Sequence, residues 1–374
     1  MPSRRAKLRK SDVVIRGHDR VIQQWDLLRA FAAQCSQDGR MDDLPYFLEK
    51  PGLFPQTPHL FLFTKREVLP LGGIREDELA PQHLIAAVLL WEYRVAGLHT
   101  RAFTIADRTG GALLAPPELR LRIAARIRDK LMADGASVAL ISTDATDTPG
   151  GEADLLRTAQ TPPGYTWGWR HRPLPVHLEL QSTMDATLAK MGQKTRQNLR
   201  YYRRRAEREL GCHFIPNAHM TPHEAIQLNN ISTHSVSADT VRWRLRAHKL
   251  LQDPFLMGIK DDAGRWLSIV GGRRYNGTTE ILWQMNRNDL PLSSLSTVLR
   301  SYYMEHEIQR GMKYLTVEGG TPHTMTNSFV KRDVYDVVLL RKPLLSPLRA
   351  VMAHRVSKDN LLLEMLQAPD VVWR

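Results

Sequence analysis

Three apolar segments joined by two tight-turn signals constrain the fold of this chain more than any other feature. The segments are Phe255–Lys260, Trp266–Tyr275 and Thr279–Asn286. Asp-Asp-Ala-Gly at 261–264 joins the first two, and Asn276-Gly277 joins the second and third. Both are hairpin signals, because Asn, Asp and Gly tolerate the backbone that tight turns need. The sequence therefore predicts three consecutive antiparallel strands.

The segments around these strands show helical and strand periodicity in a definite order. Helices precede them, and a helix, a strand, a helix and a strand follow. The expected later elements are Leu295–Gln309, Tyr314–Val317, His323–Val330 and Val334–Leu340. This order predicts an α+β class with a mostly antiparallel sheet.

The first half has a similar but shorter order of antiparallel strands, a helix (Glu118–Ala133) and a strand (Ser137–Ile141). A length of 374 residues suits two domains better than one core. The stretch 144–163 is rich in Pro, Gly and Thr, as linkers often are. We expect domains at 1–165 and 166–374, with a duplicated architecture.

Charge is unevenly distributed along the chain, whose formal net charge is +13. Residues 1–180 hold 24 Lys and Arg against 21 Asp and Glu, whereas the remainder holds 28 against 18. An anionic partner is therefore expected to bind the second half.

The remaining composition indicates a cytoplasmic protein without a metal. Cys35 and Cys212 have no zinc-ligand spacing, and reduced, buried thiols are expected. The histidines are scattered, so no metal site is predicted. No apolar run approaches the roughly 20 residues of a membrane span, and the basic start MPSRRAKLRK is not followed by the apolar region of a secretory signal.

The segment 194–210, KTRQNLRYYRRRAEREL, is unusually rich in arginine. As a helix it has one apolar face, formed by Leu199, Tyr202, Ala206 and Leu210. Arginines occupy most of the rest, at 196, 200, 203, 204 and 208. Guanidinium groups bind phosphate and carboxylate in a bidentate manner, so an anion-binding surface is one interpretation. A solvated face of an amphipathic helix is the other.

The Lys-x-Arg-x-Asn-x-Arg motif of this helix, followed by three strands, a helix and a strand ending in an acidic residue and glycine, resembles the CelD-like branch of the GNAT superfamily. That branch is related to the FemAB-type transferases. The resemblance covers about 178–342 and includes Glu318-Gly319-Gly320 and a later aromatic-Lys pair, with Val330 inserted between Phe329 and Lys331. It implies an acyl-CoA N-acyltransferase fold, as two tandem GNAT-like units of which the first is degenerate.

The resemblance also implies where the donor, acetyl-CoA or a longer acyl-CoA, would bind. Its pyrophosphate would lie on backbone N–H groups at the turn before the long helix, at Leu292, Ser293, Ser294, Leu295 and Ser296. This turn has no glycine, unlike the usual one in the family. A plain helix cap at Ser293 is an equal alternative.

Three residues are candidate general bases for deprotonating an acceptor amine: Glu318, Glu280 and His323. Backbone N–H groups of the Trp266–Tyr275 strand, at a bulge expected at Gly271-Gly272, would polarise the thioester carbonyl. The acid that protonates the leaving thiolate is unassigned. The arginine helix, through Lys194, Arg196, Arg200 and Arg204, together with Lys331, would bind the acceptor.

The sequence thus predicts an acyl-CoA-dependent N-acyltransferase acting on an unidentified acceptor, with an anionic acceptor as the candidate. Two alternatives stay open. A FemAB-like enzyme would take an aminoacyl group from tRNA, although no long helical-hairpin insertion is visible. A catalytically inactive protein of the same fold would only bind its partner, with Tyr201 and Tyr202 available to stack on bases.

Overall fold

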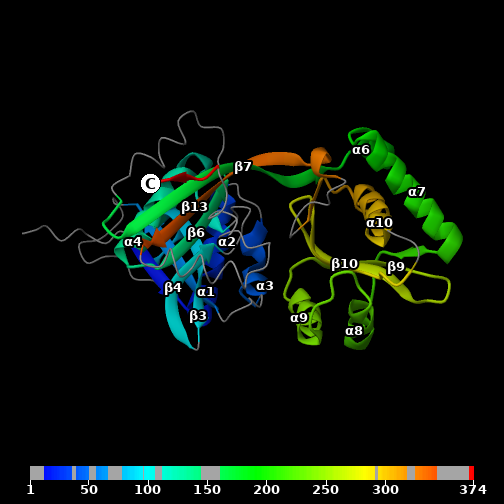
Figure 1. Ribbon diagram of the computed structural model, residues 1–374, viewed down its shortest axis with the longest axis horizontal. Coiled ribbons are helices and arrows are strands. Elements are labelled where there is room, and N and C mark those ends of the chain that lie inside the picture. Colours follow the sequence, from blue (N-terminus) through cyan, green and yellow to red (C-terminus); the bar gives the residue numbers. More distant parts are fainter. Residues whose placement is uncertain are drawn as a thin grey trace, which may run out of the picture. The chain divides into compact units, whose positions relative to one another are not determined.

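The computed structural model describes residues 12–35, 39–49, 56–65, 78–95, 97–105, 112–144, 161–290, 294–317, 325–342 and 370–374. They belong to two compact units (Figure 1). The first contains residues 1–44, 51–174 and 332–374, and the second contains 45–50 and 175–331. The boundary expected at 165/166 therefore differs from the structural one, because two long strands, β7 (Tyr165–Glu179) and β13 (Val330–Arg341), contribute residues to both units.

The first unit is built on a sheet with the strand order β1-β2-β3-β4-β6-β13-β7. Besides β7 and β13, its strands are β1 (Asp12–Arg16), β2 (Gln56–Thr64), β3 (Leu84–Val95), β4 (Leu98–Ile105), β5 (Leu113–Leu114), β6 (Val138–Asp144) and β14 (Val372–Trp373). Its helices include α1 (His18–Ile22), α2 (Trp25–Gln34) and α4 (Arg120–Ala133). Short 3-10 turns occupy Gly39–Asp43, Pro81–His83 and Pro117–Leu119.

The second unit has the strand order β7-β12-β11-β10-β9-β8. These strands are β8 (His213–Ile215), β9 (Pro254–Lys260), β10 (Trp266–Tyr275), β11 (Thr278–Asn286) and β12 (Tyr314–Val317). Its helices are α3 (Leu44–Glu49), α6 (Met184–Ala189), α7 (Gln193–Leu210), α8 (Pro222–Asn230), α9 (Ala238–His248) and α10 (Leu295–Gln309). In Figure 1, α7 and α10 lie on one side of β9 and β10, and α8 and α9 lie on the other.

Both units contain the same succession of elements. Three antiparallel strands are followed by a helix and by a strand that pairs parallel to the third. In the first unit these are β2-β3-β4, α4 and β6, and in the second β9-β10-β11, α10 and β12. Two pairs, β4 with β6 and β11 with β12, are parallel and make the sheets mixed, although antiparallel pairs predominate among the described strands, as the sequence predicted.

Two apolar clusters fill the two faces of the second sheet. One joins Leu199 and Ala206 of α7 to Val298 of α10 and to the sheet. The other joins α8 and α9 to Trp266 and Trp283. The helical face predicted for 194–210 is thus the buried one, although Tyr202 is only partly buried. Burial of this apolar face against α10 and the sheet holds the otherwise highly charged helix α7 on the second unit.

Two helices predicted from the sequence are different in the structure. The apolar spacing of Val21–Ala33 predicts one helix, whereas the structure divides this segment into α1 and α2 by a turn at Gln23–Gln24. In the segment expected to be helical at His323–Val330, residues Thr326–Ser328 form a single 3-10 turn and Val330 already begins β13.

Within the described ranges, no helix combines the length and the apolar character needed to cross a membrane. Cys35 and Cys212 are free and buried.

Candidate functional site

Strand β12 pairs in parallel with the first part of β11. The two strands pair from Thr278 with Tyr314 as far as Ile281 with Val317. Strand β11 continues to Asn286, and β12 ends at Val317. Backbone groups of β11 that face the β12 side beyond Ile281 therefore have no β12 residue beside them in the described chain.

Helix α10 is the next helix along the chain after β11, and it begins at a serine with an unusual backbone. Ser294 has φ +80 and ψ 32, a left-handed conformation that costs a non-glycine residue about 1–2 kcal/mol. Its hydroxyl does not cap the helix. Its carbonyl oxygen accepts from the N–H groups of Thr297 and Val298. The N–H groups of Leu295 and Ser296, in the first turn of the helix, have no carbonyl within the helix to bind. The positive end of the helix dipole and these donors suit an anion.

A bulge lies where the sequence predicted one, at Gly271-Gly272, but the additional residue belongs to the neighbouring strand. Gly271 pairs with Trp283 and Gly272 with Ile281, so Leu282 of β11 has no opposite residue. Both glycines are required sterically. A Cβ on Gly271 would lie 2.3 Å from the Trp283 ring, and one on Gly272 would lie 2.0 Å from the Glu280 carbonyl oxygen. The bulge re-aims the backbone of β11 just where β12 ends.

Glu280, one of the three candidate bases, lies buried next to this bulge. Its Oε2 accepts from Nε of Arg273 at 2.7 Å, and the two side chains are 3 % and 0 % exposed. The Arg273 guanidinium also stacks on the Tyr275 ring at 4.3 Å. A carboxylate held in this way stabilises a buried cation and is not presented to solvent.

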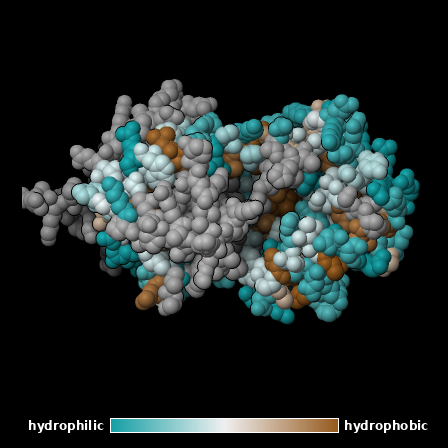
Figure 2. All heavy atoms as spheres, in the orientation of Figure 1, coloured by the Kyte–Doolittle hydropathy of each residue, from teal (hydrophilic) through white to brown (hydrophobic). Residues whose placement is uncertain are grey.

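The arginines of α7 form a stripe along the helix surface. Arg196, Arg200 and Arg204, together with Gln193, Gln197 and Tyr201, line a hollow of about 440 Å³. The surface over α7 is mostly hydrophilic (Figure 2). The structure therefore brings three of the predicted acceptor-binding residues together on one face, one helical turn apart.

All three arginines have local partners. Arg204 donates through Nε to the carbonyl oxygen of Arg200 at 3.3 Å. Arg196 donates through Nη1 to the carbonyl oxygens of Ala189 and Met191, at the end of α6. Arg200 bonds Asp185 at 2.8 Å, in a pair whose two side chains are both largely exposed. An exposed pair of this kind contributes little to stability, so the Arg200 guanidinium can exchange its partner for a ligand.

The other predicted residues are distributed as follows. Lys194 is exposed in the first turn of α7, and Lys331 is exposed at the start of β13. Glu318, His323, Leu292 and Ser293 lie outside the described residues. Glu318 nevertheless follows directly after Val317, the last residue of β12.

Sequence reasoning missed one charged group that positions this site. Glu307 of α10 is fully buried and bonds the Arg274 guanidinium through both carboxylate oxygens, at 2.7 and 2.9 Å. This pair attaches α10 to β10. The signal was available, because Glu307 falls on the apolar face of a predicted helix, where a charged residue needs a buried partner.

The chain matches known proteins by its three-dimensional structure and not by its sequence. No family model matches the chain, and no curated protein sequence matches it. The solved structure of FemX covers 89 % of this chain and 99 % of its own, with 11 % identity and a TM-score of 0.50. The match to the structure of L-PGS from Bacillus licheniformis covers 88 % of this chain and 94 % of that one, with 13 % identity and a TM-score of 0.48. The match to a tandem GNAT protein from the clavulanic acid biosynthesis pathway covers 88 % of this chain and 98 % of that one, with 12 % identity and a TM-score of 0.47.

The chain therefore has the fold of FemX. At 11 % identity the likeness concerns the fold, and donor and acceptor have to be argued from the site.

Proposed function

We propose that this protein is an N-acyltransferase that moves an acyl group from acyl-CoA to the amine of an anionic acceptor. The observation that carries the proposal is the start of α10, where Ser294 has a left-handed backbone and its hydroxyl does not cap the helix, together with the bulge at Leu282 of β11. Strained backbone of this kind persists where the surrounding structure holds it, often at ligand sites. The motif in α7 supports a place in the CelD-like branch.

In the proposed reaction the acceptor nitrogen attacks the thioester carbonyl, the C–S bond breaks, and the thiolate takes up a proton. The N–H groups at the start of α10 bind the pyrophosphate of the donor. Backbone N–H groups of β11 next to the Leu282 bulge donate to the carbonyl oxygen as negative charge develops on it. Glu318 receives the proton of the amine, because Glu280 is already engaged by Arg273 and the other candidate, His323, is farther along the chain from β12.

Donor binding is tested by two substitutions at one position. Ser294→Glu adds a negative charge at the anion site and should weaken acetyl-CoA and longer acyl-CoA binding at least about tenfold, as measured by titration calorimetry. Ser294→Gly is the matched control. It removes the hydroxyl and the backbone strain together, so binding should be retained and the fold stabilised. Equal affinity in the two variants would contradict a pyrophosphate site at this turn.

The base is tested separately from the donor site. Glu318→Gln keeps size and hydrogen bonding but cannot accept the proton, so turnover should fall by about 10²–10⁴ while acyl-CoA still binds. Normal turnover in the folded variant would remove Glu318 from the mechanism.

Acceptor binding is tested on α7. Arg200→Gln with Arg204→Gln leaves Arg196 on its carbonyl oxygens, so the helix should stay in place. Transfer to an anionic acceptor should weaken and lose part of its salt dependence, with acyl-CoA affinity unchanged. The control, Arg205→Gln with Arg208→Gln, removes the same charge from two arginines that both bond Glu209. Identical losses in the two double variants would show that only net charge matters.

The fold of FemX favours one further candidate, the aminoacyl-tRNA-dependent transfer that the FemAB-type resemblance implies. Failure of the wild-type protein to bind any acyl-CoA, together with salt-sensitive binding of tRNA, would replace the first proposal with this one. Binding without transfer in either case would identify an inactive member of the fold.

A further inference from the structure

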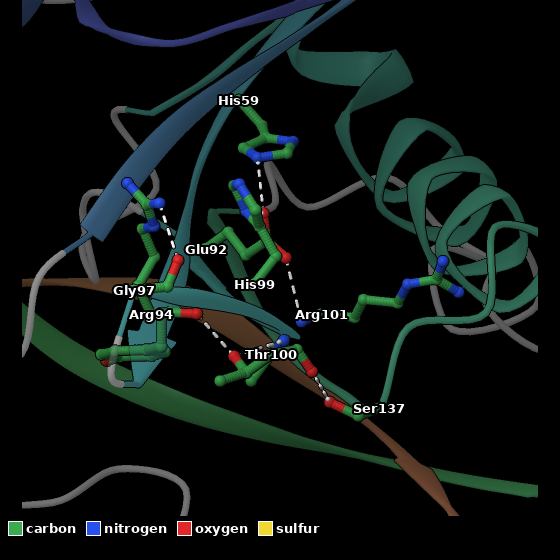
Figure 3. Close-up of polar contacts among 10 residues, drawn as sticks. His59, Glu92, Arg94, Gly97, His99, Thr100, Arg101 and Ser137 are labelled. Carbon is green, nitrogen blue, oxygen red and sulfur yellow. Dashed lines mark hydrogen bonds and ion pairs between the residues drawn. The ribbon is translucent and has the colours of Figure 1, made fainter.

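A buried carboxylate in the first unit lies between two histidines (Figure 3). Glu92 Oε2 lies 2.7 Å from Nδ1 of His99 and 2.9 Å from Nε2 of His59. The side chains of Glu92 and His59 are each 4 % exposed, whereas that of His99 is 55 % exposed. One ligand atom from each of the three residues lies within 4.8 Å of the other two. The cluster is therefore closed on its inner side and open to solvent on the side of His99.

The second oxygen of Glu92 is held by a strained turn of backbone. Oε1 accepts from the N–H of Arg101 at 2.9 Å, and Arg101 has φ 55, in the left-handed region. The pairing of β3 with β4 is irregular here, between Glu92 and Arg94. Ser137 holds the strained segment from its other side, with its N–H on the Arg101 carbonyl and its hydroxyl on the Thr100 carbonyl, both at 2.9 Å.

The ring of His59 is fixed by aromatic neighbours. It stacks on Phe61 at 6.4 Å between ring centroids and meets Phe103 edge-on at 5.2 Å. Burial lowers the pKa of His59 below its usual value, despite the opposing effect of Glu92.

All three residues line a pocket of about 460 Å³ that Arg16, Arg101 and Asp134 also border. His99 and Arg101 precede the part of β4 that pairs with β6, which begins at Ala102. The pocket belongs to the first unit, so it is separate from the site at α10 and β11.

We propose that His59, Glu92 and His99 bind a divalent transition-metal ion, with Zn²⁺ as the reference ion. Two imidazoles and one carboxylate suit such ions, and three protein ligands leave further coordination positions for water or a ligand in the pocket. Bonds of about 2.0–2.1 Å at tetrahedral angles separate ligand atoms by about 3.3 Å. The nitrogens would need to move apart from Oε2 by only about half an ångström, and the exposed His99 side chain has room to do so.

Binding shifts the histidine protons. The ring nitrogens that face Glu92 are Nδ1 of His99 and Nε2 of His59. A proton on either of them moves through solvent to the other nitrogen of the same ring, so each imidazole stays neutral and turns a lone pair to the ion, and Glu92 Oε2 becomes a ligand instead of a hydrogen-bond acceptor. The Arg101 N–H stays on Oε1 and orients the carboxylate, as outer partners of metal ligands do.

The test uses the full chain after removal of bound metal with EDTA. Zn²⁺ should bind at one equivalent in a chelator competition, and Co²⁺ should give a visible absorption band when added alone. His99→Ala removes an exposed ligand, so the fold should survive and affinity should fall at least about tenfold. His219→Ala, an exposed histidine of the second unit, is the control and should change nothing.

Glu92→Gln provides a second variant, which keeps the shape of the buried side chain and should also lose the Co²⁺ band. The proposal is overturned if the wild-type protein binds neither ion at one equivalent. It is equally overturned if His99→Ala binds as tightly as wild type, because the ion would then lie elsewhere.

Discussion

Acidification should destabilise the second unit through one buried histidine. His248 of α9 is 6 % exposed, and its Nε2 donates to the carbonyl oxygen of Phe255 at 2.9 Å. Burial lowers the pKa of this imidazole from 6.5 to about 4. Between these values the unfolded chain holds a proton that the folded one does not. Stability therefore falls as the pH falls through this window, and is fully present above it.

The magnitude follows from the two pKa values. Between pH 7.5 and pH 4.5 this proton uptake should remove about 2.5 kcal/mol from the free energy of unfolding. Urea denaturation across that range measures it, with His248→Gln as the reference, because glutamine can still donate to Phe255 and does not titrate. Other groups titrate in both proteins, so the difference between them isolates His248. Parallel stability curves for the two proteins would refute the reasoning.

Three further substitutions or probes test the packing around the site. Gly272→Ala should destabilise the sheet by more than about 2 kcal/mol in urea unfolding, because its Cβ would overlap the Glu280 carbonyl oxygen; an unchanged midpoint would show that the bulge relaxes. Glu307→Gln leaves the Arg274 cation without its charge partner and should cost about 3 kcal/mol in the same assay, so a loss under 1 kcal/mol would count against the pair. Burial raises the pKa of Cys212 to about 12, and iodoacetamide at pH 8 should label it only after unfolding; rapid labelling of native protein would contradict this.

Local sequence signals predicted the elements of the second unit closely. Strand β10 and helix α10 have the bounds that the sequence indicated, and β9 and β11 each begin one residue earlier. Their turns and periodicities are local, so no distant contact was needed to find them. The two-residue turn Asn276-Gly277 even sets the register that places Arg273 opposite Glu280.

The features that the sequence could not reveal depend on distant pairing. The residues of the proposed metal site come from β2, β3 and β4, and no tight-turn signal sets the register between the first two of these strands. The sequence pattern indicates a strand only at Leu174–Leu180, yet β7 begins at Tyr165, because its first part pairs within the first unit. The turn at Ser294 was identified from the resemblance, although it lacks the glycine that is usual there. Its left-handed backbone could not be predicted, because serine has no propensity for this conformation.

The return of the chain to the first unit through β13 has a consequence for folding during synthesis. Strand β6 pairs with β13 in a register that joins Ile141 to Val337. Every residue of the second unit leaves the ribosome before this partner does. The second unit can therefore close while β6 still has an unpaired edge, and closing that long loop is entropically costly and slow. A fragment starting at residue 166 would carry β13 without β6, and it would expose a strand edge prone to aggregation.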